Sequence, residues 1–123
     1  MIKRSLVILY LLMASPLAGA QISVSAQTEI TQLLAVLGSS TCEFNRNGSW
    51  HSAPDAKAHL QKKYEYLLKK KMINSTEEFI AKGATKSSIS ADAYQVRCHN
   101  KPTLASAIWL TNQLQLLRAG SKK

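Results

Sequence analysis

The feature that most constrains this chain is an N-terminal leader followed by only two cysteines. Lys3 and Arg4 precede a short apolar run over residues 6–14, and small residues follow at positions 18–20 and 24–26. This order is typical of a cleavable secretory signal, with cleavage predicted after residue 20 or residue 26. A retained hydrophobic anchor is the alternative, but the run is shorter than the roughly 20 residues that cross a bilayer. We therefore expect residues 1–26 to be a signal peptide and the processed protein to have no stable membrane span.

The two cysteines, Cys42 and Cys98, both lie in the exported part of the chain. In an oxidising compartment an even pair is interpreted first as a disulfide. Closing a loop of this length contributes roughly 4 kcal/mol in the chain-entropy description. The alternative is a redox-active or metal-binding pair, but there is no Cys-x-x-Cys spacing and two thiols do not fill a zinc site. We predict a structural disulfide, with no metal and no cofactor.

The remainder of the chain has the size of one domain. Residues 27–120 are predicted to form a single small globular unit, followed by a disordered tail at 121–123. Loss of the two leader cations lowers the formal net charge from +9 to +7. The processed protein is therefore small and basic.

Apolar residues recur at helical spacing in four stretches. We predict helices around Ile30, after Ser52, after Ser75 and from Pro102 onward, because the last three positions carry typical helix-start residues. Gly38 is expected to follow the end of the first helix. One face of each helix is apolar, so the helices need partners.

The segment after the first helix has the pattern of a β-hairpin. Asn47-Gly48 favours a two-residue type I′ turn, which would place Phe44 opposite His51. Residues 94–98 alternate as a later strand, and its cysteine can reach the hairpin cysteine only if the strands are close. We therefore predict an α+β fold, with about four helices packed on a small antiparallel sheet formed by the hairpin and one later strand.

Short motifs along the chain occur in the order and spacing of a known family. The motifs are Phe44-x-Arg46-Asn47-Gly48, His59-Leu60, Lys63-Tyr64, Glu78-Phe79-Ile80, Ser87-Ser88 and Tyr94-x-Val96. Between about residues 33 and 117 the chain thus resembles the domain of unknown function 5329, found in small exported proteins of Gram-negative bacteria. It departs from the family at 91–93, where Gly-x-Pro is common. The resemblance implies a periplasmic location and no particular activity.

Four polar residues form a candidate binding or structural cluster: Arg46, His51, His59 and Tyr94. Histidine titrates near neutral pH and arginine stays charged, so the cluster could bind an anion or transfer protons. The other interpretation is a structural network in which these groups satisfy one another. Because no carboxylate or nucleophile motif completes a catalytic arrangement, we assign no catalytic residue.

A second set of residues is a candidate for surface contact: Trp50, Lys62, Lys63, Lys69 and Lys70. The lysines make the second helix basic, and a solvated helix face explains most such charge. Export separates the protein from the genome, so we do not expect nucleic acid as a partner. The tryptophan could be an exposed anchor or could pack beneath another element.

Three hypotheses for function follow from these residues. The first is a non-enzymatic envelope accessory or binding module, whose partner is an unknown envelope protein or an anionic envelope component. The second is a polyanion or membrane-surface binder that uses the basic second helix. The third is a small hydrolase or transferase that uses the histidine and arginine cluster.

Overall fold

The computed structural model describes residues 22–121. Most of the predicted leader, the cleavage site after residue 20 and the last two residues of the predicted tail lie outside this range. The elements, in chain order, are α1 (Val24–Ser39), β1 (Glu43–Arg46), β2 (Ser49–His51), α2 (Ala53–Lys69), α3 (Thr76–Gly83), β3 (Gln95–Arg97), β4 (Leu104–Ala105) and α4 (Ser106–Ser121).

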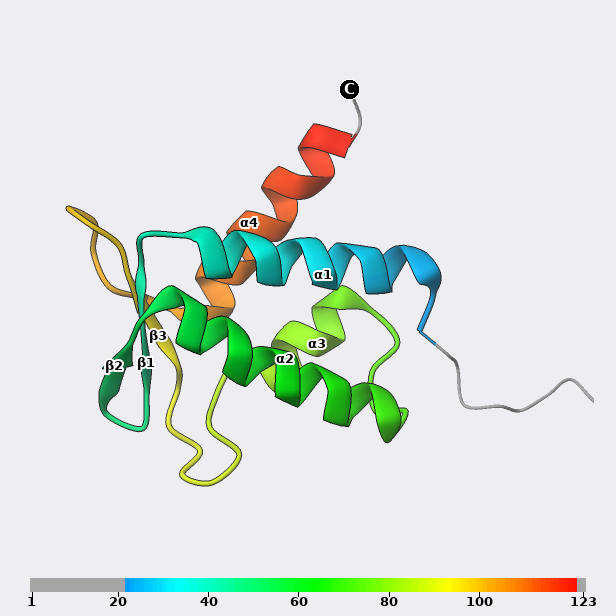
Figure 1. Cartoon of the computed structure of the whole chain (residues 1–123), viewed down its shortest axis with the longest axis horizontal. Helices are drawn as coiled ribbons and strands as arrows, with labels where there is room; N and C mark the ends of the chain where they lie inside the picture. Colours follow the sequence, from blue (N-terminus) through cyan, green and yellow to red (C-terminus); the bar gives the residue numbers. More distant parts are fainter. Residues whose placement is uncertain (1–21, 122–123) are drawn as a thin grey trace, which may run out of the picture.

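The helices form one body and the sheet lies at one end of it (Figure 1). α1 and α2 run side by side, α3 packs against both, and the C-terminal half of α4 extends away from the sheet. The buried positions of α2 form the apolar stripe that helical periodicity predicts, and they are Ala53, Ala56, Leu60, Tyr64 and Leu67. The predicted α+β class is confirmed.

Serine side chains cap the N-terminal ends of α2 and α3 at the predicted positions. The hydroxyl of Ser52 accepts the backbone N–H of Asp55, and the hydroxyl of Ser75 accepts that of Glu78. Each bond satisfies one of the N–H groups that a helix start leaves without a partner. These caps fix where α2 and α3 begin.

Gly38 has a different role from the predicted one, because it lies inside α1 rather than after its end. The helix ends one residue later, where the Ser40 hydroxyl donates to the carbonyl of Leu37 at 2.8 Å. A Cβ atom at position 38 would lie 2.5 Å from Cδ of Lys57 on α2. The glycine therefore permits close approach of the two helices.

The hairpin register agrees with the prediction. Phe44 pairs with His51, and Asn47 and Gly48 take positive φ angles of 54° and 83° in the turn. β3 then pairs antiparallel with β1, and the strand order is β2-β1-β3-β4. The hairpin and the later strand are therefore neighbours, as the disulfide prediction required.

The structure adds a fourth strand and moves the start of the last helix. The predicted helix start at Pro102 is wrong, because Leu104 pairs with Val96 in β4 and α4 begins only at Ser106. The N–H of Ser106 donates to the carbonyl of Tyr94 at 2.8 Å. Strand pairing satisfies these backbone groups before the helix begins. α4 then continues to residue 121, the first position of the predicted tail.

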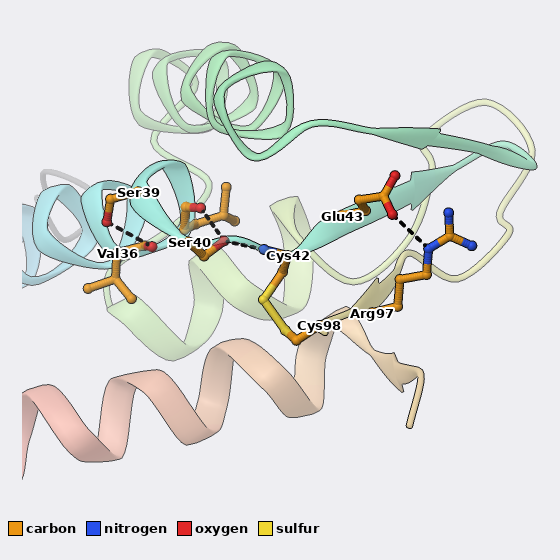
Figure 2. Close-up of a disulfide and its surroundings, with 8 residues drawn as sticks. Val36, Ser39, Ser40, Cys42, Glu43, Arg97 and Cys98 are labelled. Atoms are coloured by element: carbon orange, nitrogen blue, oxygen red, sulfur yellow. Dashed lines mark hydrogen bonds and ion pairs between the residues drawn. A yellow bond between two sulfur atoms is a disulfide. The ribbon is translucent and has the colours of Figure 1, made fainter. Parts of the chain in front are cut away.

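The disulfide between Cys42 and Cys98 is present and joins the beginning of β1 to the end of β3 (Figure 2). The next pair along these strands is Glu43 and Arg97, which form an ion pair of 3.1 Å on the outer face of the sheet. On the inner face, Phe44 packs edge-on against Trp109 of α4, with ring centroids 5.5 Å apart. The bridge thus holds together the two central strands, and α4 covers their inner side.

Candidate functional site

Three adjoining hollows follow the exposed border of α2. The inner cavity, about 30 Å³, lies beneath the hairpin and is lined by Arg46, His51, Asp55, His59 and Tyr94 together with neighbouring polar and apolar residues. The turn pocket, about 400 Å³, is lined by Arg46, Asn47, His59, Lys63, Ser88 and Tyr94 with other loop residues. The α2–α3 groove, about 750 Å³, is lined mainly by Lys62, Lys63, Tyr66, Met72, Lys82 and Lys86. His59 borders all three, so they form one concave face.

All four residues of the predicted polar cluster come together here. Arg46 and His51 reach the inner cavity from the hairpin, His59 from α2 and Tyr94 from the residue before β3. Alternation along β1 turns Arg46 to the same face as Phe44, and helical spacing places His59 beside the buried stripe of α2.

A hydrogen-bonded chain connects α2 to the segment before β3. Nζ of Lys63 donates to the Tyr94 hydroxyl at 3.1 Å and to the carbonyl of Lys86 at 3.2 Å. Nε2 of His59 lies 3.1 Å from the same hydroxyl. Because lysine can only donate, the Tyr94 oxygen accepts from Lys63 and its own proton is free for His59. Lys63, predicted as a surface contact, is therefore half-buried within the cluster.

The surroundings lower the pKa values of two basic groups in the cluster, His59 and Lys63. Burial, followed by the nearby charges of Arg46 and Lys63, lowers the pKa of His59 to about 4. Burial also lowers the pKa of Lys63, again with a contribution from Arg46. Burial raises the pKa of Tyr94. At neutral pH the site therefore contains a neutral imidazole and a protonated phenol between two cations.

The concave face has far more positive than negative groups. Its cationic side chains are Arg46, Lys62, Lys63, Lys82 and Lys86, while Asp55 is the one carboxylate among the described residues that line the three hollows. Of these cations, Lys82 is paired with Glu78 at 3.3 Å. Within residues 22–121, the guanidinium of Arg46 donates no hydrogen bond and forms no ion pair. An anion in the turn pocket would therefore meet donors that lack a protein counter-charge.

The wall opposite α2 is a loop over residues 84–92, and it is fastened at several points. The buried hydroxyl of Ser87 accepts the N–H groups of Ile89 and Ser90, which closes a tight turn. The Ser90 hydroxyl donates to Oδ1 of Asn47 at 2.7 Å, which joins the loop to the hairpin turn. Figure 1 shows the hairpin turn and this loop on the same side of the molecule, next to α2. The pocket walls are thus built from distant parts of the chain.

The remaining predicted contact residues lie elsewhere. Trp50 is on the outer face of the sheet, where the Arg97 guanidinium stacks 3.9 Å from its ring centre. Lys69 and Lys70 are exposed at the C-terminal end of α2 and do not line the three hollows. These three residues are therefore separate from the polar cluster.

Sequence reasoning missed part of the wall. The segment containing Lys86 and Ser88 has no helical or strand periodicity, so the sequence predicts no element there. The recurring Ser87-Ser88 motif was the one signal that could have placed it near the cluster. Its position depends on contacts with residues about 23 to 43 positions away in the chain, which local patterns do not encode.

The fold and the site define a class: a small, disulfide-closed α+β domain with one basic concave face. No helix between residues 22 and 121 is both long and apolar enough to cross a membrane. Over that same range, no three His, Cys, Asp or Glu side chains gather where they could hold a metal ion.

The chain belongs to a specific family within this class. Residues 24–118 match the family of unknown function DUF5329, as the motif order indicated. No curated protein and no solved structure shows significant similarity to the chain. The disulfide is typical of proteins outside the cytoplasm.

Proposed function

We propose that this protein is a non-enzymatic binding module of the bacterial periplasm whose ligand carries a phosphate-like or carboxylate anion. The observation that carries the proposal is that Arg46, His59 and Lys63 line the turn pocket together. His59 and Lys63 also contact the Tyr94 hydroxyl there. Guanidinium and ammonium donors of this kind bind oxyanions strongly when partly shielded from water. The leader pattern and the disulfide support the periplasmic location.

The electrostatics of the polar cluster also favour an anionic ligand. Burial lowers the pKa values of His59 and Lys63, and repulsion from the charge of Arg46 contributes in the same direction. A bound anion would relieve this repulsion and favour the charged forms of both side chains. The free energy of anion binding should therefore be more favourable at this site than at an isolated surface lysine.

The hydrolase or transferase hypothesis receives less support from the geometry. A nucleophile would need a lowered pKa or an oriented base, whereas burial raises the pKa of Tyr94. Nε2 of His59 faces the same tyrosine, and no described carboxylate bonds to its ring. Burial lowers the pKa of Lys63, but its Nζ already bonds to the Lys86 carbonyl and the Tyr94 hydroxyl. The geometry therefore favours hydrogen-bond donation to a ligand over nucleophilic attack.

The membrane-surface hypothesis uses the basic second helix, whose candidate lysines lie partly outside the three hollows. Lys69 and Lys70 project at the end of α2, away from the cluster, and their side chains are exposed. Exposed lysines of this kind give contacts that weaken with salt and carry little specificity. The pocket offers partly shielded, hydrogen-bonded donors instead.

The experiment is a calorimetric titration of the processed protein with inorganic phosphate. Arg46→Gln should weaken binding by about tenfold or more, because one charge-assisted hydrogen-bonding group is lost. Arg97→Gln is the matched control, since it removes the same charge from the opposite face of the same sheet. Equal weakening in both variants, or in neither, would contradict the proposal.

A further inference from the structure

The concave face combines positive charge with exposed apolar side chains. Six large apolar side chains are exposed within the described part of the chain, and Tyr66, Met72 and Ile89 are three of them. Tyr66 and Met72 line the α2–α3 groove, while Ile89 lines the turn pocket. Half of the exposed apolar groups therefore lie on the one face that also carries the cationic cluster.

The two larger hollows are continuous at their polar border. His59, Lys63, Ser87 and Ser88 line both the turn pocket and the α2–α3 groove. The α2–α3 groove is also lined by the apolar side chains of Tyr66, Leu67, Met72 and Ala81. A molecule seated in both hollows would place one end among cations and the other against apolar groups.

Lys82 is bonded within the protein at the part of the groove that contains Met72. Nζ of Lys82 donates to the Met72 carbonyl at 2.7 Å and pairs with Glu78 at 3.3 Å. Lys82 is therefore already occupied and offers little attraction to a second anion at this end. The other cations of the two hollows, among them Arg46, Lys63 and Lys86, form no ion pair within the described residues. Lys86 directly precedes Ser87 and Ser88, which lie at the border that the two hollows share.

We infer that the ligand is an amphiphilic anion, a phosphate-bearing lipid bound as a single molecule with its headgroup in the turn pocket and its chain along the α2–α3 groove. This inference rests on the proposed function, because the headgroup occupies the anion site described above. Charge complementarity selects the headgroup end, and the exposed Tyr66 and Met72 side chains (57% and 44% exposed) select the chain end. Each of the two hollows, about 400 and 750 Å³, lies in the size range of small-ligand sites.

The test compares two phosphate monoesters of equal charge, methyl phosphate and decyl phosphate, by calorimetry with the processed protein. Decyl phosphate is kept below its critical micelle concentration. Each fully buried methylene strengthens binding roughly fourfold, so burial of only two gives more than about tenfold. We expect decyl phosphate to bind at least about tenfold more tightly than methyl phosphate.

Two pairs of substitutions test whether the decyl chain of the ligand lies in the α2–α3 groove. Combined Tyr66→Gln and Met72→Gln should remove most of the gain from the decyl chain and leave methyl phosphate binding within about twofold of the unmodified protein. The matched control is Ile108→Gln with Leu116→Gln, which removes two comparably exposed apolar groups from α4. The control should leave both affinities unchanged.

The two claims fail differently. Equal affinity for the two esters, or a decyl gain that survives in the Tyr66 and Met72 variant, would overturn the lipid inference while leaving the anion site intact. If the unmodified protein binds neither phosphate ester, or if Arg46→Gln does not weaken the binding, the proposed function is overturned and the lipid inference with it.

Discussion

His59 is the residue whose chemistry depends most on its neighbours. Its pKa falls from an ordinary 6.5 to about 4, first through burial and then through the charges of Arg46, Lys63, His51 and Lys62. Between these two pKa values the unfolded chain binds a proton that the folded chain does not. The stabilising contribution is therefore complete above about pH 6.5 and is lost as the pH falls toward 4.

Replacement of His59 tests this linkage. In His59→Gln the side chain can still bond to Tyr94 but no longer titrates. The drop in unfolding free energy between pH 7 and pH 5 should then be smaller by roughly 1 kcal/mol, a value reduced because His59 is only partly buried. Urea unfolding at the two pH values measures it, with exposed His99→Gln as control. An unchanged drop in His59→Gln would show that this histidine does not carry the effect.

At the scale of single residues, the sequence predicted which side chains meet but not how they bond. The type I′ turn and the period of α2 placed Arg46, His51 and His59 together from local rules. The bond from Lys63 to Tyr94 depends on two side chains 31 positions apart. Such a contact follows from tertiary packing, which periodicity alone does not specify.

At the scale of elements, a charged contact fixes the C-terminal end of α4. The guanidinium of Arg118 donates to both carboxylate oxygens of Glu29 on α1, at 2.8 and 2.9 Å. It also donates to both oxygens of Glu77 on α3, at 3.0 Å each. These bonds lower the pKa values of both glutamates. One side chain therefore joins three helices.

Arg118→Met should lower the unfolding free energy by about 1 kcal/mol, because a paired two-carboxylate contact is lost from a mostly exposed site. Denaturant unfolding at pH 7 measures this value. Arg97→Met, which breaks the single pair with Glu43, should cost less. The idea fails if the Arg97 variant is the more damaging of the two, or if Arg118→Met has no effect.

The elements that sequence reasoning missed share a physical cause. β4 has only two residues and forms because Val96 offers a free ladder edge to Leu104. The loop at 84–92 takes its shape from hydrogen bonds to the hairpin and to α2. Neither has a repeating apolar pattern, whereas the longer helices do.

At the scale of the whole molecule, the fold bears on where the leader is removed. Ser23 caps α1 by accepting the N–H of Ala26, and Ile22 is buried in the core. Cleavage after residue 26 would remove this cap and the buried isoleucine. Cleavage after residue 20 would keep both.

Intact-mass analysis of the protein from its native host tests this choice. We predict a mature chain that begins at Gln21 and is two hydrogens lighter than its reduced form, because Cys42 and Cys98 are joined. A chain beginning at Gln27, or one with two free thiols, would contradict the expected processing or the oxidised state.

The central claim is that the concave face beside α2 binds an anion through the turn pocket. The most direct measurement is a backbone amide NMR titration of the processed protein with inorganic phosphate. We predict saturable shifts confined to residues around the turn pocket, which are Arg46, Asn47, His59, Lys63 and Ser88. Shifts that do not saturate, or that centre on Lys69 and Lys70 at the end of α2, would contradict it.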